Sequence, residues 1–419
     1  MKERLDKMEI YRCFLLPCTS LCDYYKEVMR VIQYIGVILF FFLVSCEKND
    51  VGPQKTRTLM VYLAGDNNLS GAMQKNINDM MATWKKSYNA NIVIYFDRSS
   101  AAPELFTFQF KGNNVEKQVL KTYEEMDSAD PEMLKKVLKD MQDLYPSDSY
   151  GLILGSHASG WIPPSMSRGN HLYTERVLTR SFGDDNKHYM DTRDMVKAIP
   201  FNRENLEFIL FDACLMSSIE VLYDLRDKAK YVIASPAELP FAGFPYTRVM
   251  PYFWGKGTDL EKDLVKVCDE FWYYYNNLDD SGRFGTIALI KMEGMDHLFD
   301  LTCEILQGKK EYVADIYQKA VYSYPVVEYR KTNMFFDLGE YMKNMTVGKE
   351  ELYKEYRDFL DNQVVIYKNA TNPFHYDTEE VPEEKFSGIA TYIPLSIWPT
   401  ETNAYWGFSW SGVYDAVTE

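Results

Sequence analysis

Short hydrophobic runs that stop at polar or glycine-containing turns recur along the chain. They cover Leu59–Ala64, Ile92–Phe96, Tyr150–Ser156, Leu206–Phe211, Tyr231–Ala234 and Thr286–Ile290. Continuous apolar runs of about four to eight residues are typical of strands buried on both faces of a sheet. Because helical or turn-like segments separate these runs, the pattern predicts an α/β fold built on a mainly parallel sheet with helices on both faces. Functional residues are then expected at the carboxyl ends of the strands.

Other patterns complete this prediction. Phe106–Phe110 and Val115–Lys121 are expected to form a hairpin around Gly112-Asn113-Asn114, and Asp130 to cap a helix that has Pro131 in its first turn. Beyond about Pro251 the pattern changes to longer amphipathic helices, and near the end of the chain it becomes strand-like. The helices are expected over Asp259–Asn277, Glu293–Gln307 and Glu350–Tyr367, and the strand over Gly388–Tyr392.

We therefore divide the chain into an α/β domain over residues 58–250 and a mostly helical C-terminal extension or second domain over residues 251–419. No linker rich in proline or serine marks the boundary between them, and no internal repeat is visible.

The longest apolar run, Val31–Val44, is too short for the ~20 residues that cross a bilayer. It follows Arg30 and ends in Leu43-Val44-Ser45-Cys46, which is typical of an export signal and resembles a bacterial lipobox. A buried core element is the alternative, but it fits poorly with the polar residues that follow at once. We expect residues 1–45 to be a lead and lipoprotein signal peptide with Met29 as the true start, Cys46 to carry a lipid, residues 46–57 to be a linker, and the protein to be anchored to a membrane of the bacterial cell envelope.

Composition narrows the class of protein. With 46% hydrophobic and 15% aromatic residues, the chain can bury a sizeable core and is not disordered. Lys and Arg number 46 against 61 Asp and Glu, which gives a net charge of −15. This balance disfavours a nucleic-acid partner, because phosphate binding depends on positive charge. It suits cationic peptides or basic side chains as ligands, although solubility explains a net charge equally well.

Three of the seven cysteines, Cys13, Cys18 and Cys22, lie in the lead, and Cys46 lies in the expected anchor. An odd number remains, Cys214, Cys268 and Cys303, so at least one thiol of an exported chain is unpaired. No cysteine or histidine spacing resembles a metal site, so we expect neither a metal nor a cofactor.

Two of the predicted strands end in residues that can do chemistry together. One strand runs into Ser156-His157 and the other into Asp212-Ala213-Cys214. In a parallel sheet both ends lie at the same edge, where an imidazole base can activate a thiol nucleophile. The alternatives are a small buried cysteine and a histidine that caps a loop. A helix expected over Leu215–Arg226 would favour the Cys214 thiolate by only about 1 kcal/mol, so His157 is needed to lower the thiol pKa further.

These residues resemble the clostripain family of cysteine peptidases, relatives of caspases, gingipains and legumain. The resemblance spans roughly Thr58 to Tyr246. It rests on Gly65-Asp66-Asn67-Asn68-Leu69, Ser156-His157-Ala158-Ser159-Gly160-Trp161, Asp212-Ala213-Cys214-Leu215-Met216, Ala234-Ser235-Pro236-Ala237-Glu238 and Gly243-Phe244-Pro245-Tyr246. It implies a caspase-like α/β/α sandwich in which His157 is the general base, Cys214 is the nucleophile, and cleavage follows Arg or Lys. Ala158 stands where these peptidases usually have glycine, but the backbone N–H groups of Ala158 and Cys214 remain available for an oxyanion hole.

Asp212 and Glu238 are candidates for the substrate pocket. Side chains two apart on a strand share a face, so Asp212 should flank Cys214, and in the family an acid at this position selects a basic side chain. The alternative is that Asp212 accepts hydrogen bonds from backbone N–H groups of the turn. Glu238 is a possible second acid near this pocket, which the sequence alone does not place.

The segment Trp161–Arg180 has few periodic apolar positions and is predicted to be an exposed loop. Its arginines, Arg168, Arg176 and Arg180, are candidate self-cleavage sites, since the resemblance implies self-processing into two associated chains. Arg168 has the most turn-like surroundings. A solvated loop whose arginines offset local acid is the alternative.

Functions other than a cysteine peptidase must also be compared with the sequence. An inactive relative that serves as a surface binding module is the main alternative, and Ala158 is the feature that supports it. No G-x-S-x-G motif indicates a serine hydrolase, and no P-loop is present. Calcium is sometimes linked to the family, yet Asp184-Asp185 and Asp279-Asp280 are interpreted as solvated turns.

Overall fold

The computed structural model describes residues 57–164, 181–255, 258–279, 282–309, 321–324, 334–372, 381–394 and 399–415. All of them belong to one compact unit, Lys55–Glu419. The signal run, Cys46 and the three arginines of the predicted loop lie outside the described residues. Among the residues that are described, no helix has the length and apolar character needed to span a bilayer.

A nine-stranded sheet forms the centre of the unit, in the order β12-β10-β9-β8-β5-β1-β2-β3-β4. The five central strands are parallel, which confirms the predicted α/β class. They are β1 (Thr58–Gly65), β2 (Asn91–Arg98), β5 (Tyr150–Gly155), β8 (Leu206–Asp212) and β9 (Tyr231–Ala234). The predicted hairpin, β3 (Ala101–Lys111) and β4 (Asn114–Thr122), extends one edge of the sheet. The strands β10 (Thr286–Lys291) and β12 (Val365–Ala370) extend the other edge and run antiparallel to their neighbours.

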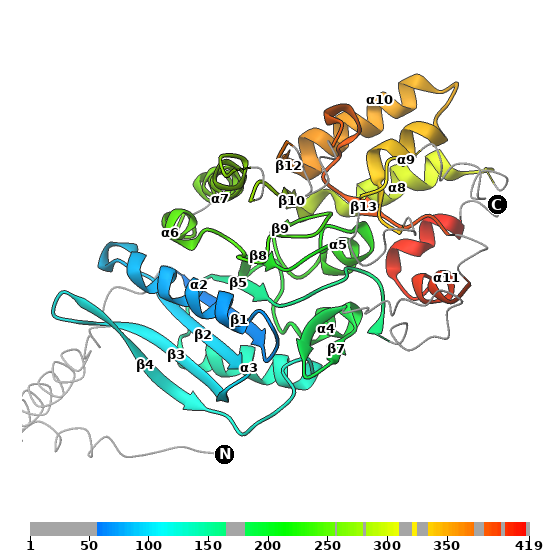
Figure 1. Cartoon of the computed structure of the whole chain (residues 1–419). Helices are drawn as coiled ribbons and strands as arrows, with labels where there is room; N and C mark the ends of the chain where they lie inside the picture. Colours follow the sequence, from blue (N-terminus) through cyan, green and yellow to red (C-terminus); the bar gives the residue numbers. More distant parts are fainter. Residues whose placement is uncertain are drawn as a thin grey trace, which may run out of the picture. The chain divides into compact units, whose positions relative to one another are not determined.

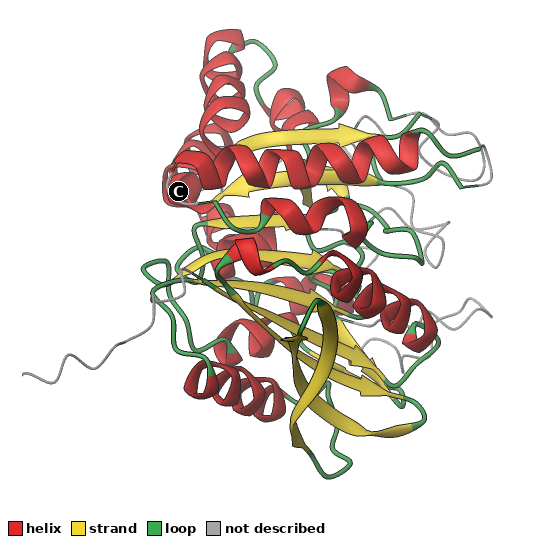
Figure 2. Cartoon of the chain, turned by 90° about the vertical axis from the view of Figure 1, so that its left-hand side faces the viewer, coloured by secondary structure: helices red, strands yellow, loops and turns green. Residues whose placement is uncertain are grey.

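Helices cover both faces of this sheet (Figure 2). Because side chains alternate along a strand, β1 places Val61 on one face and Tyr62 on the other, each in a separate hydrophobic cluster. The Val61 face packs against α2 (Ser70–Thr83), α6 (Tyr246–Val249) and α7 (Thr258–Asn276). The Tyr62 face packs against α3 (Pro131–Leu144), α4 (Thr192–Ala198), α5 (Ile219–Leu225) and α8 (Met295–Leu306). As predicted, Asp130 caps α3, where its side chain accepts a hydrogen bond from the Glu132 N–H.

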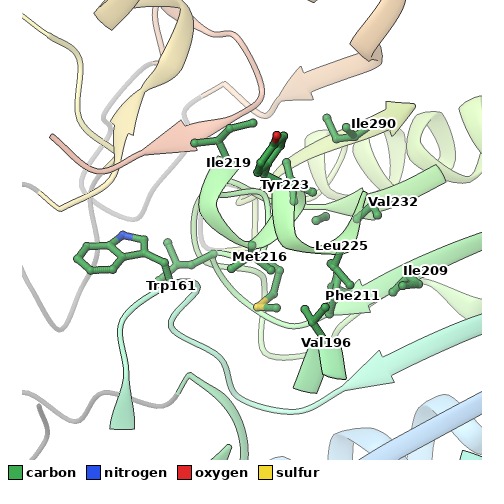
Figure 3. Packing of buried hydrophobic residues seen from close by; sticks show 14 of the residues in the cluster. Trp161, Val196, Ile209, Phe211, Met216, Ile219, Tyr223, Leu225, Val232 and Ile290 are labelled. Carbon is green, nitrogen blue, oxygen red and sulfur yellow. The ribbon is translucent and has the colours of Figure 1, made fainter. Parts of the chain in front are cut away.

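The helix predicted from Leu215 begins four residues later, at Ile219. The Leu215 N–H instead donates to the Ala237 carbonyl and the Ser217 N–H to the Ser235 carbonyl, so tertiary hydrogen bonds replace the first helical turn. From Ile219 onward the helix packs on the sheet. Figure 3 shows Leu225 of α5 close to Phe211 of β8.

A second difference between the structure and the prediction lies near the C-terminus. The helix predicted over Glu350–Tyr367 ends at Phe359 as α10 (Glu350–Phe359), and after a π-helical turn, Leu360–Val364, the chain forms β12. Residues 364–367 are Val-Val-Ile-Tyr, which favour a strand once β10 offers a partner. The sheet therefore continues across residues 250 and 251, and the predicted extension supplies two of its strands.

The remaining elements are short. They are β6 (Phe182–Asp185) paired with β7 (His188–Met190), β11 (Phe336–Asp337) paired with β13 (Ala390–Thr391), α9 (Leu338–Met345) and α11 (Pro399–Tyr405). Figure 1 shows α8, α9 and α10 grouped beyond the β10 and β12 edge of the sheet. The strand expected over Gly388–Tyr392 is thus reduced to the two residues of β13.

The C-terminal part also supports the loops that follow β5 and β8. Trp161, fully buried after β5, contacts the ring of Tyr392 at 4.4 Å between centroids. The Ser217 hydroxyl, after β8, donates to the Gly388 carbonyl at 2.7 Å, and the Ala390 N–H donates back to the Ser217 carbonyl at 2.8 Å. Residues beyond 330 therefore hold the two chain segments on which the predicted dyad lies.

Candidate active site

His157 and Cys214 lie at the same edge of the sheet, as their positions in the sequence predict. Strands β5 and β8 are parallel neighbours with Gly155 opposite Asp212, so each of the two residues follows a register partner by two positions. Both line one cavity of about 320 Å³ at the carboxyl ends of the strands. Ala158, Asp212 and Glu238 line it as well, so the structure brings together all five residues predicted for catalysis and substrate binding.

Cys214 lies in a tight turn between β8 and α5. Its Sγ accepts a hydrogen bond from the Leu239 N–H at 3.3 Å. The next residue, Leu215, has a φ of 64°, a left-handed conformation that costs a non-glycine residue about 1 kcal/mol. Since α5 starts only at Ile219, the predicted effect of its dipole on the thiol is wrong. The donor that the structure places at Sγ is this backbone N–H rather than a helix N-terminus.

The other two described cysteines pack in the core, as expected from their helical patterns. Cys268 is fully buried, and burial raises the pKa of its thiol well above the usual value. Burial also raises the pKa of Cys303. Both thiols are therefore poor nucleophiles at neutral pH.

The backbone of the His157 loop is fixed by β6. The Gly183 N–H donates to the His157 carbonyl at 3.0 Å, and the Ser159 N–H donates to the Ser181 carbonyl at 3.1 Å. These two bonds lie on either side of the antiparallel bridge between Ala158 and Phe182. The hydrogen bonds of the bridge therefore do not use the Ala158 N–H. Replacing glycine by alanine at this position therefore leaves a backbone donor beside His157.

Two further contacts shape this edge of the sheet. The Nε2 atom of His157 lies 2.6 Å from the Oδ1 atom of Asn68, which follows β1. The sequence interpretation did not single out Asn68 as a site residue. Gly160 has a φ of 59°, and a Cβ atom there would lie 2.6 Å from the Leu215 carbonyl oxygen, so only glycine lets the two loops approach this closely.

Asp212 is partly buried at one wall of the cavity. Its Oδ2 atom accepts hydrogen bonds from the Tyr246 hydroxyl at 3.0 Å and from the Phe244 N–H at 3.4 Å. Burial raises the pKa of Asp212 to about 6, and these hydrogen bonds act in the opposite direction. Asp212 thus accepts a backbone hydrogen bond from a segment 32 residues further along the chain, not from its own turn as the alternative interpretation held, and it lines the cavity with Glu238.

The interpretation of Asp184 and Asp185 as solvated turn residues is wrong. Both are buried in β6, and Asp185 accepts a hydrogen bond from the Ser128 N–H. Ser128 also donates its hydroxyl to Asp97, a fully buried residue at the end of β2. Burial raises the pKa of Asp97 to about 7 and raises the pKa of Asp185 as well. Within the described part of the chain, no three acidic, histidine or cysteine side chains are placed to bind a metal ion.

Comparison with known proteins places this arrangement in a family. The profile of the clostripain family matches residues 61–401. Clostripain of Hathewaya histolytica is 27% identical over 250 residues, which are 53% of this chain and 47% of that protein. The chain thus matches about half the length of this curated relative.

Solved structures extend the likeness over most of the chain. An inactive zymogen C11 protease from Parabacteroides distasonis is 28% identical, with a TM-score of 0.71, and the match covers 87% of this chain and 98% of that one. A secreted C11 cysteine protease from Bacteroides thetaiotaomicron, solved with an irreversible peptide inhibitor, is 27% identical with a TM-score of 0.70, covering 86% and 98%. Since the family profile spans most of the chain and the folds agree, the chain belongs to the clostripain family.

Proposed function

We propose that the protein is a cysteine endopeptidase that cleaves after Arg or Lys by a Cys214–His157 dyad. The observation that carries this proposal is the cavity at the ends of β5 and β8, where a thiol, an imidazole and two carboxylates meet. The solved relatives named as C11 proteases, one of them holding a peptide inhibitor, support the same class of reaction.

In the proposed mechanism, His157 takes the proton of Cys214, and the thiolate attacks the scissile carbonyl carbon. The carbonyl oxygen becomes an oxyanion, which the N–H groups of Ala158 and Cys214 stabilise. His157 then gives its proton to the leaving amine as the C–N bond breaks, which leaves a thioester on Cys214. Water attacks the thioester with His157 as base, and release of the acid restores the thiol.

Asp212 and Glu238 provide the proposed specificity. A guanidinium or ammonium group of the substrate would replace water around these carboxylates, and a charge-assisted bond of this kind contributes about 1.5–3 kcal/mol. The raised pKa of Asp212 means that its carboxylate is costly to keep ionised without a partner. A basic side chain in the cavity removes that cost, whereas an apolar one does not.

Self-processing is a further part of the proposal, with Arg168 as the first candidate and Arg176 and Arg180 as the others. The described residues on each side of this segment lie together, because the Ser181 hydroxyl donates to the Ile162 carbonyl at 2.6 Å. Both ends are therefore held within the loop that carries His157, and tethering of this kind gives a bond a high effective concentration at the site. Wild type should separate into two fragments on a denaturing gel and Cys214→Ala should stay intact, with N-terminal sequencing to identify the bond. An intact wild type that cleaves peptides at full rate would contradict self-processing.

We also propose that Cys46 anchors the protein to a membrane of the cell envelope. The relative named as secreted supports export of this fold. Metabolic labelling with an alkyne fatty acid should mark the wild type and leave Cys46→Ser unmarked. Equal labelling of both would contradict the anchor.

The decisive test of the proposed activity is a peptide-library cleavage profile of the protein from about residue 56, beside Cys214→Ala. We expect cleavage after Arg and Lys by the wild type, and loss of nearly all activity in Cys214→Ala and in His157→Ala. The two losses should not add in the double variant, because both residues serve one step. More than a few per cent of activity in Cys214→Ala would rule out the mechanism. Absence of cleavage, together with failure of an arginyl acyloxymethyl ketone to label Cys214, would favour a binding module instead.

A further inference from the structure

The contact between His157 and Asn68 joins the proposed base to a loop that the dyad does not include. The Asn68 Oδ1 atom lies 2.6 Å from Nε2 of the imidazole, which is within normal hydrogen-bond range. Asn68 is exposed and is not among the residues that line the cavity, although the next residue, Leu69, is. Asn68 therefore reaches the ring from outside the space that a substrate would fill.

The chemistry of the ring decides what such a contact does. An amide Oδ1 atom is an acceptor, so Nε2 must carry a proton and donate to it. In the neutral ring the basic lone pair then belongs to Nδ1, and in the imidazolium the Nε2–H donor persists. A neutral acceptor at Nε2 thus selects one tautomer and also stabilises the protonated ring.

We infer that Asn68 is a positioning residue for the proposed reaction: it holds His157 in the tautomer and orientation in which Nδ1 exchanges a proton with Cys214. The inference rests on the proposed function, since it assigns a third member to the Cys214–His157 pair. Asn68 does so without touching substrate or the reacting sulfur.

The surroundings of Asn68 show how its position is fixed. The neighbouring Asn67 donates its amide to the Ala64 carbonyl at 3.0 Å and to the Asp184 carbonyl at 2.7 Å. The Oδ1 atom of Asn67 in turn accepts the Leu69 N–H at 2.8 Å. Asn67 thus closes the turn on both sides of Asn68 and attaches it to β6.

Strand β6 is also what holds the backbone of His157. Gly183 donates to the His157 carbonyl, and the next residue, Asp184, provides the carbonyl that binds Asn67. Ser156 completes the connection, because its hydroxyl donates to Ala64 at 2.7 Å and accepts the Asp184 N–H at 3.1 Å. Base and acceptor are therefore held by two consecutive residues of one strand, which is the precision that a positioning contact requires.

Other groups near the ring must be considered in any test by pH. The titratable residues that line the cavity with His157 are Cys214, Asp212 and Glu238. Changing Asn68 alters none of them and leaves the net charge unchanged when the replacement is neutral. A change in the pH dependence of Cys214 reactivity then reports on the imidazole.

The test compares Asn68→Ala and Asn68→Asp with Asn78→Ala, an exposed asparagine on α2 whose side chain contacts Gln74. The first readout is the rate at which iodoacetamide alkylates Cys214, followed by mass spectrometry of its peptide at about pH 6 and at about pH 9.5, on either side of the reference thiol pKa. The ratio compared is the rate at about pH 6 divided by the rate at about pH 9.5. Asn68→Ala should lower this ratio about tenfold, because loss of the acceptor disfavours the thiolate–imidazolium pair at low pH. Asn68→Asp should keep or raise the ratio, and Asn78→Ala should leave it unchanged.

The second readout is hydrolysis of an arginyl peptide. Asn68→Ala should lower kcat roughly ten- to a hundredfold with little change in KM, and Asn68→Asp should recover part of the loss. A wild-type ratio and kcat in Asn68→Ala would overturn the inference, as would an equal loss of alkylation at both pH values together with a lower Tm, which indicates a structural role. If no variant, wild type included, cleaves peptide, the proposed function fails, and the alkylation ratio still decides whether Asn68 controls the ring.

Discussion

Gly243 lies against the carboxylate of Asp212 so closely that a Cβ atom on Gly243 would be 2.7 Å from both carboxylate oxygens. Gly243 also has a φ of 71°, in the left-handed region that favours glycine. The Tyr275 hydroxyl donates to its carbonyl at 2.5 Å, which attaches this loop to α7. The proposed specificity wall thus depends on a residue with no side chain.

Gly243→Ala should lower the free energy of unfolding by about 1–3 kcal/mol, from backbone strain together with the clash. The clash also displaces Asp212. The ratio of kcat/KM for an arginyl peptide to kcat/KM for a peptide with an apolar residue at the same position should therefore fall, with a smaller change in kcat/KM for the apolar peptide. Urea denaturation and a ratio of kcat/KM values measure the two effects. Gly71→Ala is the matched control, since a Cβ atom there meets nothing within 4 Å. Equal stability of Gly243→Ala and wild type would show that the loop can move away at no cost.

Asp212→Asn should separate stability from specificity. The pKa of Asp212 is raised to about 6, above the value of ~3.9 in an unfolded chain. At a pH between these two pKa values, the folded protein binds more protons at this group than the unfolded chain does. Asp212 therefore makes the free energy of unfolding fall as the pH rises, and above about pH 6 the full cost of burying the ionised carboxylate remains. The amide avoids that cost and can still accept from Tyr246. We expect Asp212→Asn to gain about 1 kcal/mol at pH 7, reduced by solvent screening, and little at pH 4.

The same substitution should lower the discrimination for Arg roughly ten- to a hundredfold. In the wild type, that discrimination should decline as the pH falls through about 6, the range in which Asp212 takes up a proton. Profiles of kcat/KM against pH for an arginyl and a leucyl peptide measure it. A wild type that cuts equally well after Leu would disprove the assignment of this wall.

Asp97→Asn should stabilise the protein chiefly at high pH. Burial raises the pKa of Asp97 to about 7, so the folded state keeps this proton over a range in which the unfolded chain has lost it. Stability contributed by the protonated carboxyl is therefore lost as the pH rises toward 7 and is absent above it. Thermal unfolding at about pH 5 and pH 8 should show a larger gain in Tm for the variant at the higher pH. A gain of the same size at both values would indicate a cause other than ionisation.

Lys187→Gly should stabilise the hairpin that joins β6 to β7. Lys187 is exposed and has a φ of 71°, and Asn186 before it has a φ of 48°. Glycine adopts this conformation without strain, so the variant should gain roughly 0.5–1 kcal/mol, and its N–H can still donate to Asp184. Denaturant unfolding checks this value. A loss of stability would show that the turn conformation costs lysine nothing.

The sequence was sufficient to predict the strands that carry the dyad, because apolar runs such as Leu206–Phe211 are buried on both faces. It was not sufficient where distant segments decide the local structure. Leu215 looks helical, but its N–H binds Ala237 across a turn. Val365–Tyr367 continues a helical pattern until β10 supplies a strand partner.

Asn68 shows a different kind of omission. It belongs to the polar stretch that ends β1, and β1 is the parallel neighbour of β5. Because the carboxyl ends of β1 and β5 lie at the same edge of the sheet, the position of Asn68 after β1 was enough to predict that it lies near His157. Asp185 could not be placed in this way, since its burial depends on Ser128 from a separate loop.

The central pairing of β5 with β8 has a consequence for the proposed processed form. A cut after Arg168, Arg176 or Arg180 would leave β1 to β5, with His157, on one polypeptide, and β6 to β13, with Cys214, on another. Their six register pairs and the contacts of Trp161 would then join two chains without a covalent link. Once denatured, such a pair must find its partner by diffusion, so recovery of activity should depend on protein concentration, whereas the uncut chain should refold at any dilution. After processing, unfolding would therefore be difficult to reverse at low protein concentration, because the two polypeptides separate when they unfold.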